Sequence, residues 1–305
     1  MALSSAPKRA LLIAGPTASG KSAVAADLAA GCDGVIINAD AMQVYGQLRI
    51  LSARPSGEEE ARIPHRMYGH VHASERYSVG RWLDDVALVL EEVWASGQLP
   101  VVVGGTGLYF KALVEGLAPV PDIPQEVRAR VAEWYQAEGE EGLKRRLSPA
   151  DSDLVDHHRL IRALEVREAT GRSLQEWQQD RSTPLLDGPG VTRAFLMPDR
   201  QTAYARCEAR FDRMLAGGAV AEVEALMALN LDRELPAMKA IGVSEISGYL
   251  AGELSLEEAA VLAKTQTRRY VKRQMTWYRS QMPGWPALAP EDAAERLLTE
   301  LQEAC

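Results

Sequence analysis

Residues Ala10–Ala30 read ALLIAGPTASGKSAVAADLAA, and this stretch decides the fold. Ala10–Ala14 is a short continuous apolar run typical of a buried strand, and Ser22–Ala30 has the alanine content and spacing of a helix. Between them, GPTASGKS at Gly15–Ser22 fits the pattern G-x-x-x-x-G-K-[ST] in the strand-loop-helix context that confirms this motif. The stretch predicts a phosphate-binding loop.

The loop supplies several kinds of contact to a chain of phosphates. Its glycines let backbone N–H groups turn toward phosphate oxygens, and the start of the helix adds partial positive charge. Lys21 supplies a full charge, and Ser22 can ligate Mg²⁺. A glycine-rich turn without a ligand is the alternative. We predict a phosphate site formed by Gly15, Pro16, Thr17, Ala18, Ser19, Gly20, Lys21 and Ser22, with Ser22 as the metal ligand.

Other apolar runs repeat the strand pattern. Val35–Asn38 (VIIN) and Leu99–Val103 (LPVVV) each have the composition of a strand covered on both faces, and Val79–Ser96 has amphipathic helical spacing. Strands that alternate with helices indicate a parallel sheet with helices on both faces. We therefore predict an α/β fold, a P-loop NTPase-like parallel sheet flanked by helices, with functional loops at the carboxyl ends of the strands.

The middle of the chain has a different character. PVPDIP at Pro119–Pro124 interrupts the pattern, and a charged segment with helical spacing and no clear strand follows. Val191–Leu196 reads as a returning strand of the core, and the chain from Asp199 onward reads as helices only. We predict a helical insertion domain at 121–189 and a core domain made of residues 1–120 and 190–305.

Composition limits the class of protein. The 305 residues are 47% apolar, and 34 Lys and Arg against 42 Asp and Glu give a formal charge of −8. Any nucleic-acid site must therefore be a local basic patch. Three scattered cysteines lack the spacing of a zinc site or a disulfide framework, and no apolar stretch approaches the length of a membrane span. We expect a cytoplasmic protein with no membrane association.

Two segments follow strand ends and carry candidate site residues. In NADAMQVY (Asn38–Tyr45), the carboxylate of Asp40 can accept a proton from a nucleophile, but a helix N-cap is the commoner role of such an aspartate. In GGTGLYF (Gly104–Phe110), Thr106 offers a hydroxyl and Tyr109 an aromatic face, although a tight turn explains the glycines without a ligand. The residues alone leave both alternatives open.

Basic residues gather in three places. Val261–Gln281 contains six cations and no acid, so one helix face can dock on the core and the other can meet phosphates, unless it is simply solvated. His157–Arg167 holds a smaller basic group. Arg206 and Arg210 lie one turn apart, and the pattern does not decide between a site and an exposed face. The six cations are Lys264, Arg268, Arg269, Lys272, Arg273 and Arg279.

In combination and in this order, these motifs resemble those of the tRNA dimethylallyltransferases, the tRNA delta(2)-isopentenylpyrophosphate transferases of the IPP transferase family. The resemblance rests on GPTASGKS, NADAMQVY, GGTGLYFKAL, RLIRALEVREATGRSL, RFDRMLAGG, MKAIGVSEISGYLAGELSLEEA and TRRYVKRQMTWYR. It implies that the loop holds dimethylallyl diphosphate instead of ATP. The dimethylallyl group would move to the exocyclic amine (N6) of the adenine 3′-adjacent to the anticodon of a tRNA, and pyrophosphate would leave.

The resemblance also implies roles for single residues. Asp40 matches the family's general base, Thr17 and Arg210 match positions that contact the diphosphate, and Mg²⁺ is the expected cofactor. The insertion would close on the anticodon stem-loop. The implied tRNA contacts are Asp40, Ala41, Met42, Gln43, Thr106, Arg128, His158, Arg159, Leu160, Ile161, Arg162, Arg268, Arg269, Lys272, Arg273 and Arg279.

Three departures from the family pattern affect the details of RNA contact. Leu51–Pro55 reads LSARP where the family commonly has Gly-Thr-Ala-Lys-Pro, and His65-Arg66 stands where the family has paired histidines. His157-His158 stands where the family usually has Asp or Gln before the arginine of the insertion. We expect a monomer. The alternative functions are prenylation of free adenine nucleotides, a small-molecule kinase, and a P-loop RNA-binding module without catalysis.

Overall fold

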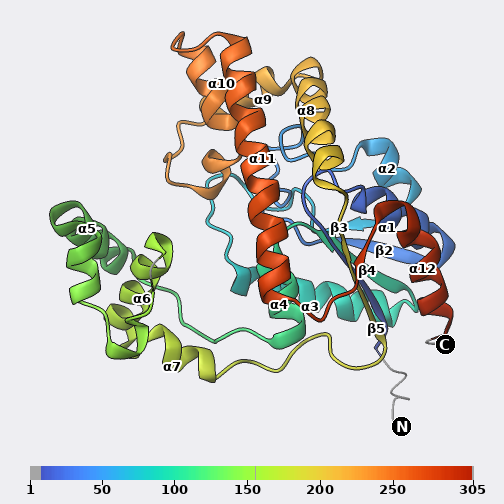
Figure 1. Ribbon diagram of the computed structural model, residues 1–305, viewed down its shortest axis with the longest axis horizontal. Coiled ribbons are helices and arrows are strands. Elements are labelled where there is room, and N and C mark those ends of the chain that lie inside the picture. The colour runs from blue at the N-terminus through green and yellow to red at the C-terminus, as the bar shows by residue number, and fades with distance from the viewer. Residues whose placement is uncertain (1–7, 155, 304–305) are drawn as a thin grey trace. The chain divides into compact units, whose positions relative to one another are not determined.

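The computed structural model describes residues 8–154 and 156–303, and the chain forms two compact units (Figure 1). The first unit comprises Met1–Val114 and Leu186–Cys305, and the second comprises Glu115–Leu185. The insertion predicted at 121–189 overlaps the second unit.

A single six-stranded parallel sheet forms the centre of the first unit, and this confirms the predicted α/β fold. Two strands were not predicted, because two residues are too short to show an apolar pattern. The expectation that only helices follow Asp199 is therefore wrong at Ala287–Leu288, which pairs with the preceding strand. In spatial order the strands are β3 (His65–Arg66), β2 (Gly34–Asn38), β4 (Leu99–Gly104), β1 (Ala10–Ala14), β5 (Val191–Leu196) and β6 (Ala287–Leu288).

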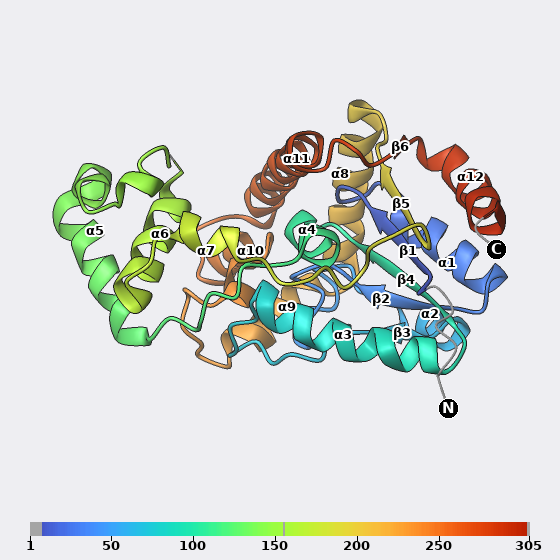
Figure 2. The same cartoon turned by 90° about the horizontal axis from the view of Figure 1, so that it is seen from below.

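Helices cover both faces of this sheet (Figure 2). Strand side chains alternate between the two faces, so Leu11 and Ile13 of β1 lie in the core cluster formed with the helices α1 (Lys21–Gly31) and α12 (Pro290–Glu303). The opposite face carries α3 (Val79–Ala95) and α4 (Gly107–Glu115). Full coverage explains why these strands have continuous apolar sequences.

Four further helices of the first unit pack against one another (Figure 1). Here α8 and α11 are in contact through Ala203, Cys207, Val271 and Met275. These helices are α8 (Arg200–Ala216), α9 (Ala219–Met227), α10 (Val243–Leu250) and α11 (Leu256–Gln281), with a 3₁₀ turn at Pro236–Lys239. The short helix α2 (Gly57–Arg62) lies apart from them, beside α1 (Figure 1).

The second unit is helical in its described residues, as the apolar spacing predicts. It consists of α5 (Gln125–Arg145), α6 (His157–Thr170) and α7 (Leu174–Gln179), with a 3₁₀ turn at Pro149–Asp151. Gly139 interrupts α5 with a φ of 64°. Two small apolar clusters stabilise the unit, one around Val127 and Val166 and one around Val131, Leu143 and Leu164.

Three strands of the sheet end at the same level. Ala14 of β1 pairs with Gly104 of β4, and Asn38 of β2 pairs with Val103. Just past these ends, the Gly15 N–H donates to the Gly104 carbonyl at 3.3 Å and the Ala39 N–H donates to the Val103 carbonyl at 2.8 Å. The three loops that follow therefore leave the sheet side by side.

Replacing Gly104 with alanine tests how tightly these strand ends fit together. A Cβ at Gly104 would lie 2.1 Å from the backbone oxygen of Ala39, so β2 and β4 would have to separate. We expect Gly104→Ala to lower the free energy of unfolding by about 2 kcal/mol or more, as overpacking does. Urea unfolding measures this. Gly57→Ala is the control, because nothing lies within 4 Å of its added Cβ, and equal midpoints for the two variants would contradict the expectation.

Candidate functional site

The backbone of the phosphate loop is left-handed at two positions. Gly20 has a φ of 87°, and Ala18 also lies in the left-handed region with a φ of 62°. A Cβ at Gly15 would lie 2.7 Å from the Ser19 Oγ and 3.0 Å from the Leu196 carbonyl oxygen. A left-handed residue other than glycine costs free energy, and such strain concentrates at functional sites. The loop therefore holds a shape suited to binding.

Two partly buried cations lie beside this loop. Lys21 donates from its Nζ to the Pro16 carbonyl at 3.2 Å, and burial lowers its pKa to about 8, with the positive charge of Arg210 adding to the decrease. Burial also lowers the pKa of Arg210, on α8. The Arg210 side chain makes no hydrogen bond or ion pair with the described residues, so an anion bound beside it would neutralise its charge.

Asp40 lies at the end of β2 and is held in place by Asn38. The buried Asn38 side chain accepts the Asp40 N–H at 2.9 Å and donates to the Asp40 carbonyl at 3.0 Å. The Asp40 Oδ1 accepts the N–H of Met42 at 2.9 Å. Residues 41–44 form turns, so the alternative of a helix N-cap is wrong, and Oδ1 caps a turn instead. Oδ2 accepts no hydrogen bond from the described residues.

The charge of Asp40 reaches several groups around the site. It opposes the decrease in the pKa of Lys21 and of Arg210. Burial raises the pKa of Tyr68 and of Tyr270, and the negative charge of Asp40 raises both further. The negative charge of Asp40 thus acts on both cations and on aromatic side chains from separate segments.

The glycine turn after β4 closes another side of the site. The Thr106 Oγ1 accepts the Ala41 N–H at 2.9 Å, and the Thr106 N–H donates to the Ala39 carbonyl at 3.1 Å. Tyr109 does not offer the expected aromatic face, because it is buried and its ring stacks on Trp82 with centroids 4.2 Å apart. The predicted contact residue Thr106 therefore also fixes the segment beside Asp40.

Gln274 on α11 belongs to the site and was not predicted. It is 6% exposed, its Oε1 accepts the Thr17 N–H at 3.0 Å, and its Nε2 donates to the Gly105 carbonyl at 2.8 Å. The sequence contains a signal for it: Gln274 is a polar residue on the helix face where Val271, Met275 and Tyr278 are buried.

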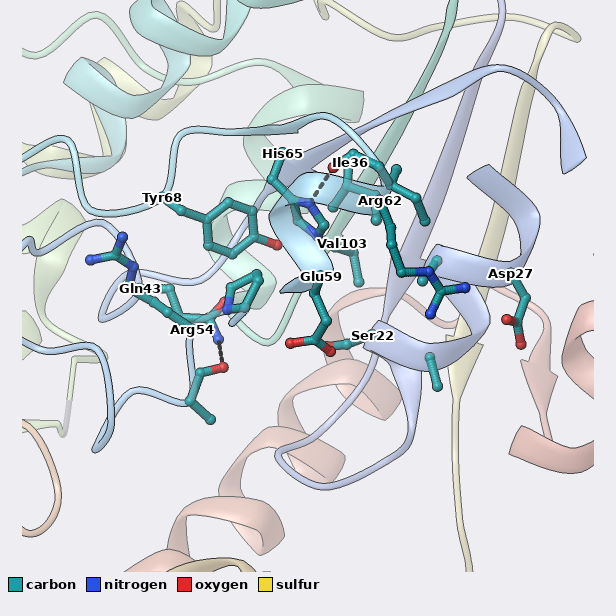
Figure 3. A pocket seen from close by; sticks show the side chains of 15 residues that line it. Ser22, Asp27, Ile36, Gln43, Arg54, Glu59, Arg62, His65, Tyr68 and Val103 are labelled. Atoms are coloured by element: carbon teal, nitrogen blue, oxygen red, sulfur yellow. Dashed lines mark hydrogen bonds between the residues drawn. The ribbon is translucent and has the colours of Figure 1, made fainter. Parts of the chain in front are cut away.

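A cavity of about 250 Å³ adjoins the phosphate loop at Ser22 (Figure 3). Arg54 and His65 line it, and both belong to segments where this chain departs from the family pattern. Gln43 also lines it, and its Nε2 donates to the carbonyls of Ser52 at 3.0 Å and Ala53 at 2.9 Å. The Gln43 nitrogen therefore already has partners within the protein.

Comparison with known proteins identifies the family. A family model described as IPP transferase matches residues 43–281, and one described as Isopentenyl transferase matches residues 8–71. The chain belongs to the IPP transferase family. It is therefore a transferase, and the resemblance that the motifs indicate is confirmed.

Curated relatives match nearly the whole chain. A tRNA dimethylallyltransferase from Azorhizobium caulinodans is 49% identical over 299 residues, covering 96% of each chain. One from Chelativorans sp. is 53% identical over 285 residues, covering 91% of this chain and 98% of the relative.

Solved structures share the fold. The tRNA isopentenylpyrophosphate transferase of Bacillus halodurans aligns with a TM-score of 0.70 at 29% identity, covering 97% of this chain and 98% of that one. A eukaryotic dimethylallyltransferase, described as acting on tRNA, aligns with a TM-score of 0.75 at 24% identity, covering 95% of this chain and 77% of that one. The P-loop-like fold is therefore that of the family.

The basic residues of α11 are not equivalent. Arg269, Lys272 and Arg273 are exposed and form no ion pair with any residue that the structure describes. Two of the six cations have carboxylate partners outside their own stretch of sequence. Lys264 pairs with Asp212 at 2.6 Å, and Arg268 pairs with Glu208. Both acids lie on α8 and are distant in sequence, so the local pattern did not show them. Arg279 is exposed and donates to the Met197 Sδ at 3.3 Å.

In the second unit, some of the predicted RNA contacts are exposed, whereas others are buried or paired with a carboxylate. Arg128 and Arg162 each lie 3.6 Å from the Glu165 carboxylate. Leu160 is 0% exposed, so the prediction that its side chain contacts RNA directly is wrong; the side chain is buried in the second unit. Ile161 packs against an apolar cluster. The exposed predicted residues here are His158 and Arg159.

Neither a membrane segment nor a preformed metal cluster appears in residues 8–154 and 156–303. Across these residues, every helix is too short or too polar to cross a bilayer. No three or more His, Cys, Asp or Glu side chains among them are placed to hold a metal ion.

The lowered pKa of Lys21 predicts pH-dependent binding of inorganic pyrophosphate. Because that pKa is about 8, Lys21 loses its charge as the pH rises through 8, and the attraction for the anion falls. Titration calorimetry between pH 7 and pH 9.5 measures the dissociation constant. We expect the affinity ratio of wild type to Lys21→Met to decline by about tenfold. Dividing by the variant removes the titration of pyrophosphate itself, and a constant ratio would contradict the assignment.

Proposed function

We propose that this protein transfers a dimethylallyl group from dimethylallyl diphosphate to the N6 amine of the adenine 3′-adjacent to the anticodon in tRNA, releasing pyrophosphate. One observation carries the proposal. Lys21 and the unpaired Arg210 lie beside the phosphate loop, where the charge of Asp40 acts on both, in a chain whose curated relatives are tRNA dimethylallyltransferases. The proposed active site thus combines a diphosphate-binding half and a proton-accepting half.

Loss of the leaving group is the first requirement of this reaction. The allylic C–O bond breaks and negative charge gathers on pyrophosphate, so donors fixed in advance stabilise the transition state. We assign this role to the loop amides, Lys21 and Arg210, with Thr17 as a further diphosphate contact. Arg210 has no competing partner among the described residues, which supports the assignment.

Formation of the new bond requires a proton acceptor. The adenine N6 forms a bond to the allylic carbon and loses one proton, and we assign that proton to the Asp40 Oδ2. The Oδ1 already accepts the Met42 N–H at 2.9 Å, whereas Oδ2 remains available. The adenine must leave its stack to reach this carboxylate, as other bases do in enzymes that modify them.

The loop also suits a divalent cation, and we propose Mg²⁺. Ser22 is exposed at the start of α1, and the absence of a carboxylate cluster in the described part of the chain fits an ion held mainly by diphosphate oxygens and water. Ser22 would be its protein ligand. When bound, Mg²⁺ supplies positive charge to the leaving diphosphate.

We assign tRNA binding to exposed and partly exposed residues of both units. On the first unit these are Ala41, Met42 and Thr106 beside Asp40, and the α11 cations Arg269, Lys272, Arg273 and Arg279. On the second unit they are His158 and Arg159, with Arg128 and Arg162 behind them as a pair that shares Glu165. We further propose a cytoplasmic monomer that clamps the anticodon stem-loop with the second unit.

Mass spectrometry of the RNA product tests the reaction. Protein, Mg²⁺, dimethylallyl diphosphate and an anticodon stem-loop with consecutive adenines should give RNA heavier by one five-carbon unit. Asp40→Asn should lower kcat by about 10²- to 10⁴-fold, the range for loss of a general base. Asp84→Asn is the matched control, because Asp84 is exposed on α3. Turnover of ATP without a mass gain would favour a kinase instead.

The salt dependence of RNA binding separates free cations from neutralised ones. Arg273 is exposed and forms no ion pair within the described residues, so Arg273→Ala should reduce the slope of log K against log salt concentration by about 0.7–0.9. Arg268→Ala should leave the slope unchanged, because Glu208 already neutralises Arg268. Fluorescence anisotropy with a labelled stem-loop measures both slopes, and equal losses in the two variants would refute this division.

A further inference from the structure

Gln274 is a buried polar residue with both ends of its side-chain amide in use. Its Oε1 accepts the Thr17 N–H at 3.0 Å, and its Nε2 donates to the Gly105 carbonyl at 2.8 Å. Thr17 belongs to the phosphate loop and Gly105 to the turn after β4. One side chain on α11 therefore connects two loops that follow different strands.

The connection continues to the segment that carries Asp40. Next to Gly105, Thr106 exchanges two hydrogen bonds with Ala39 and Ala41, the neighbours of Asp40, at 3.1 Å and 2.9 Å. A Cβ placed on Gly105 would lie 2.6 Å from the Gln274 Nε2 and 3.3 Å from the Asp40 Oδ2. Gly105 is thus in close proximity to both the amide and the carboxylate, and a shift of this turn moves the surroundings of Asp40.

We propose that Gln274 is a positioning residue that sets the separation between the phosphate loop and Asp40, and thereby the rate of group transfer. This inference rests on the proposed function. Gln274 acts through Thr17 and Gly105, so its loss should disturb the alignment of donor and acceptor. A misplacement of about 1 Å costs about a hundredfold in rate. The RNA-facing cations Lys272 and Arg273 remain in place without it.

Gln274→Met removes both hydrogen bonds while keeping nearly the same side-chain volume. We expect kcat for transfer to the stem-loop to fall about 10- to 100-fold, while KM for the stem-loop stays within about twofold. Gln266→Met is the matched control. Gln266 precedes Gln274 on α11, and its side chain makes no hydrogen bond to the described residues, so that variant should keep the wild-type kcat.

Gln274→Glu distinguishes positioning from packing. When ionised, the new carboxylate can accept the Thr17 N–H but repels the Gly105 carbonyl; when protonated, it can again donate to that carbonyl. The ratio of kcat for Gln274→Glu to kcat for wild type should therefore rise as the pH is lowered. A residue needed only for packing would give a ratio independent of pH. This variant also decides the question if circular dichroism shows that Gln274→Met is unfolded.

The possible results distinguish a failure of this inference from a failure of the proposed function. A wild-type protein that adds no five-carbon unit to RNA overturns the proposed function and the inference together. A wild-type protein that does so, alongside a Gln274→Met variant with the kcat of Gln266→Met, overturns the inference alone. A KM for the stem-loop that rises as steeply as kcat falls also overturns it, because Gln274 would then contribute to RNA binding.

Discussion

The candidate site depends on one constraint: β1, β2 and β4 end side by side at the carboxyl edge of the sheet. Parallel pairing of Ala14 with Gly104 and of Asn38 with Val103 fixes it. Because the register is set by backbone hydrogen bonds and by apolar side chains on both faces, the phosphate loop and Asp40 emerge together at this edge of the sheet. Gly104 lacks a side chain where β4 passes the backbone of Ala39, and this allows the close approach.

Charge is arranged around this edge in two ways. Lys264 and Arg268 are neutralised by Asp212 and Glu208 across the interface between α8 and α11. Arg210, also on α8, has no carboxylate partner of its own within the described residues. The same pair of helices therefore pairs some of its cations with its own carboxylates and leaves Arg210 without one in the described chain, so a formal charge of −8 is compatible with local positive charge beside the phosphate loop.

The sequence alone predicts the parts of this protein that depend on local pattern. GPTASGKS, the four longer strands of the sheet and the helix Val79–Ala95 follow from apolar periodicity and glycine spacing. The two-residue strands carry too little pattern. Ion pairs between α8 and α11, and the burial of Leu160 and Tyr109, depend on which helix packs against which, and a local stretch does not contain that information. The helix pattern marks Gln274 as a polar residue on a buried face, but its two partners lie 257 and 169 residues away, so the local stretch does not show what it contacts.

The hydrogen bond that the Met42 N–H donates to Asp40 restricts the rotation of the Asp40 side chain. A free aspartate rotates among several side-chain conformations, and meeting a partner normally restricts it. Here the side chain is oriented when the chain folds, by the same bond that closes the turn. The entropy of that restriction is lost during folding, so little rotational freedom of this side chain remains to be lost when a partner binds.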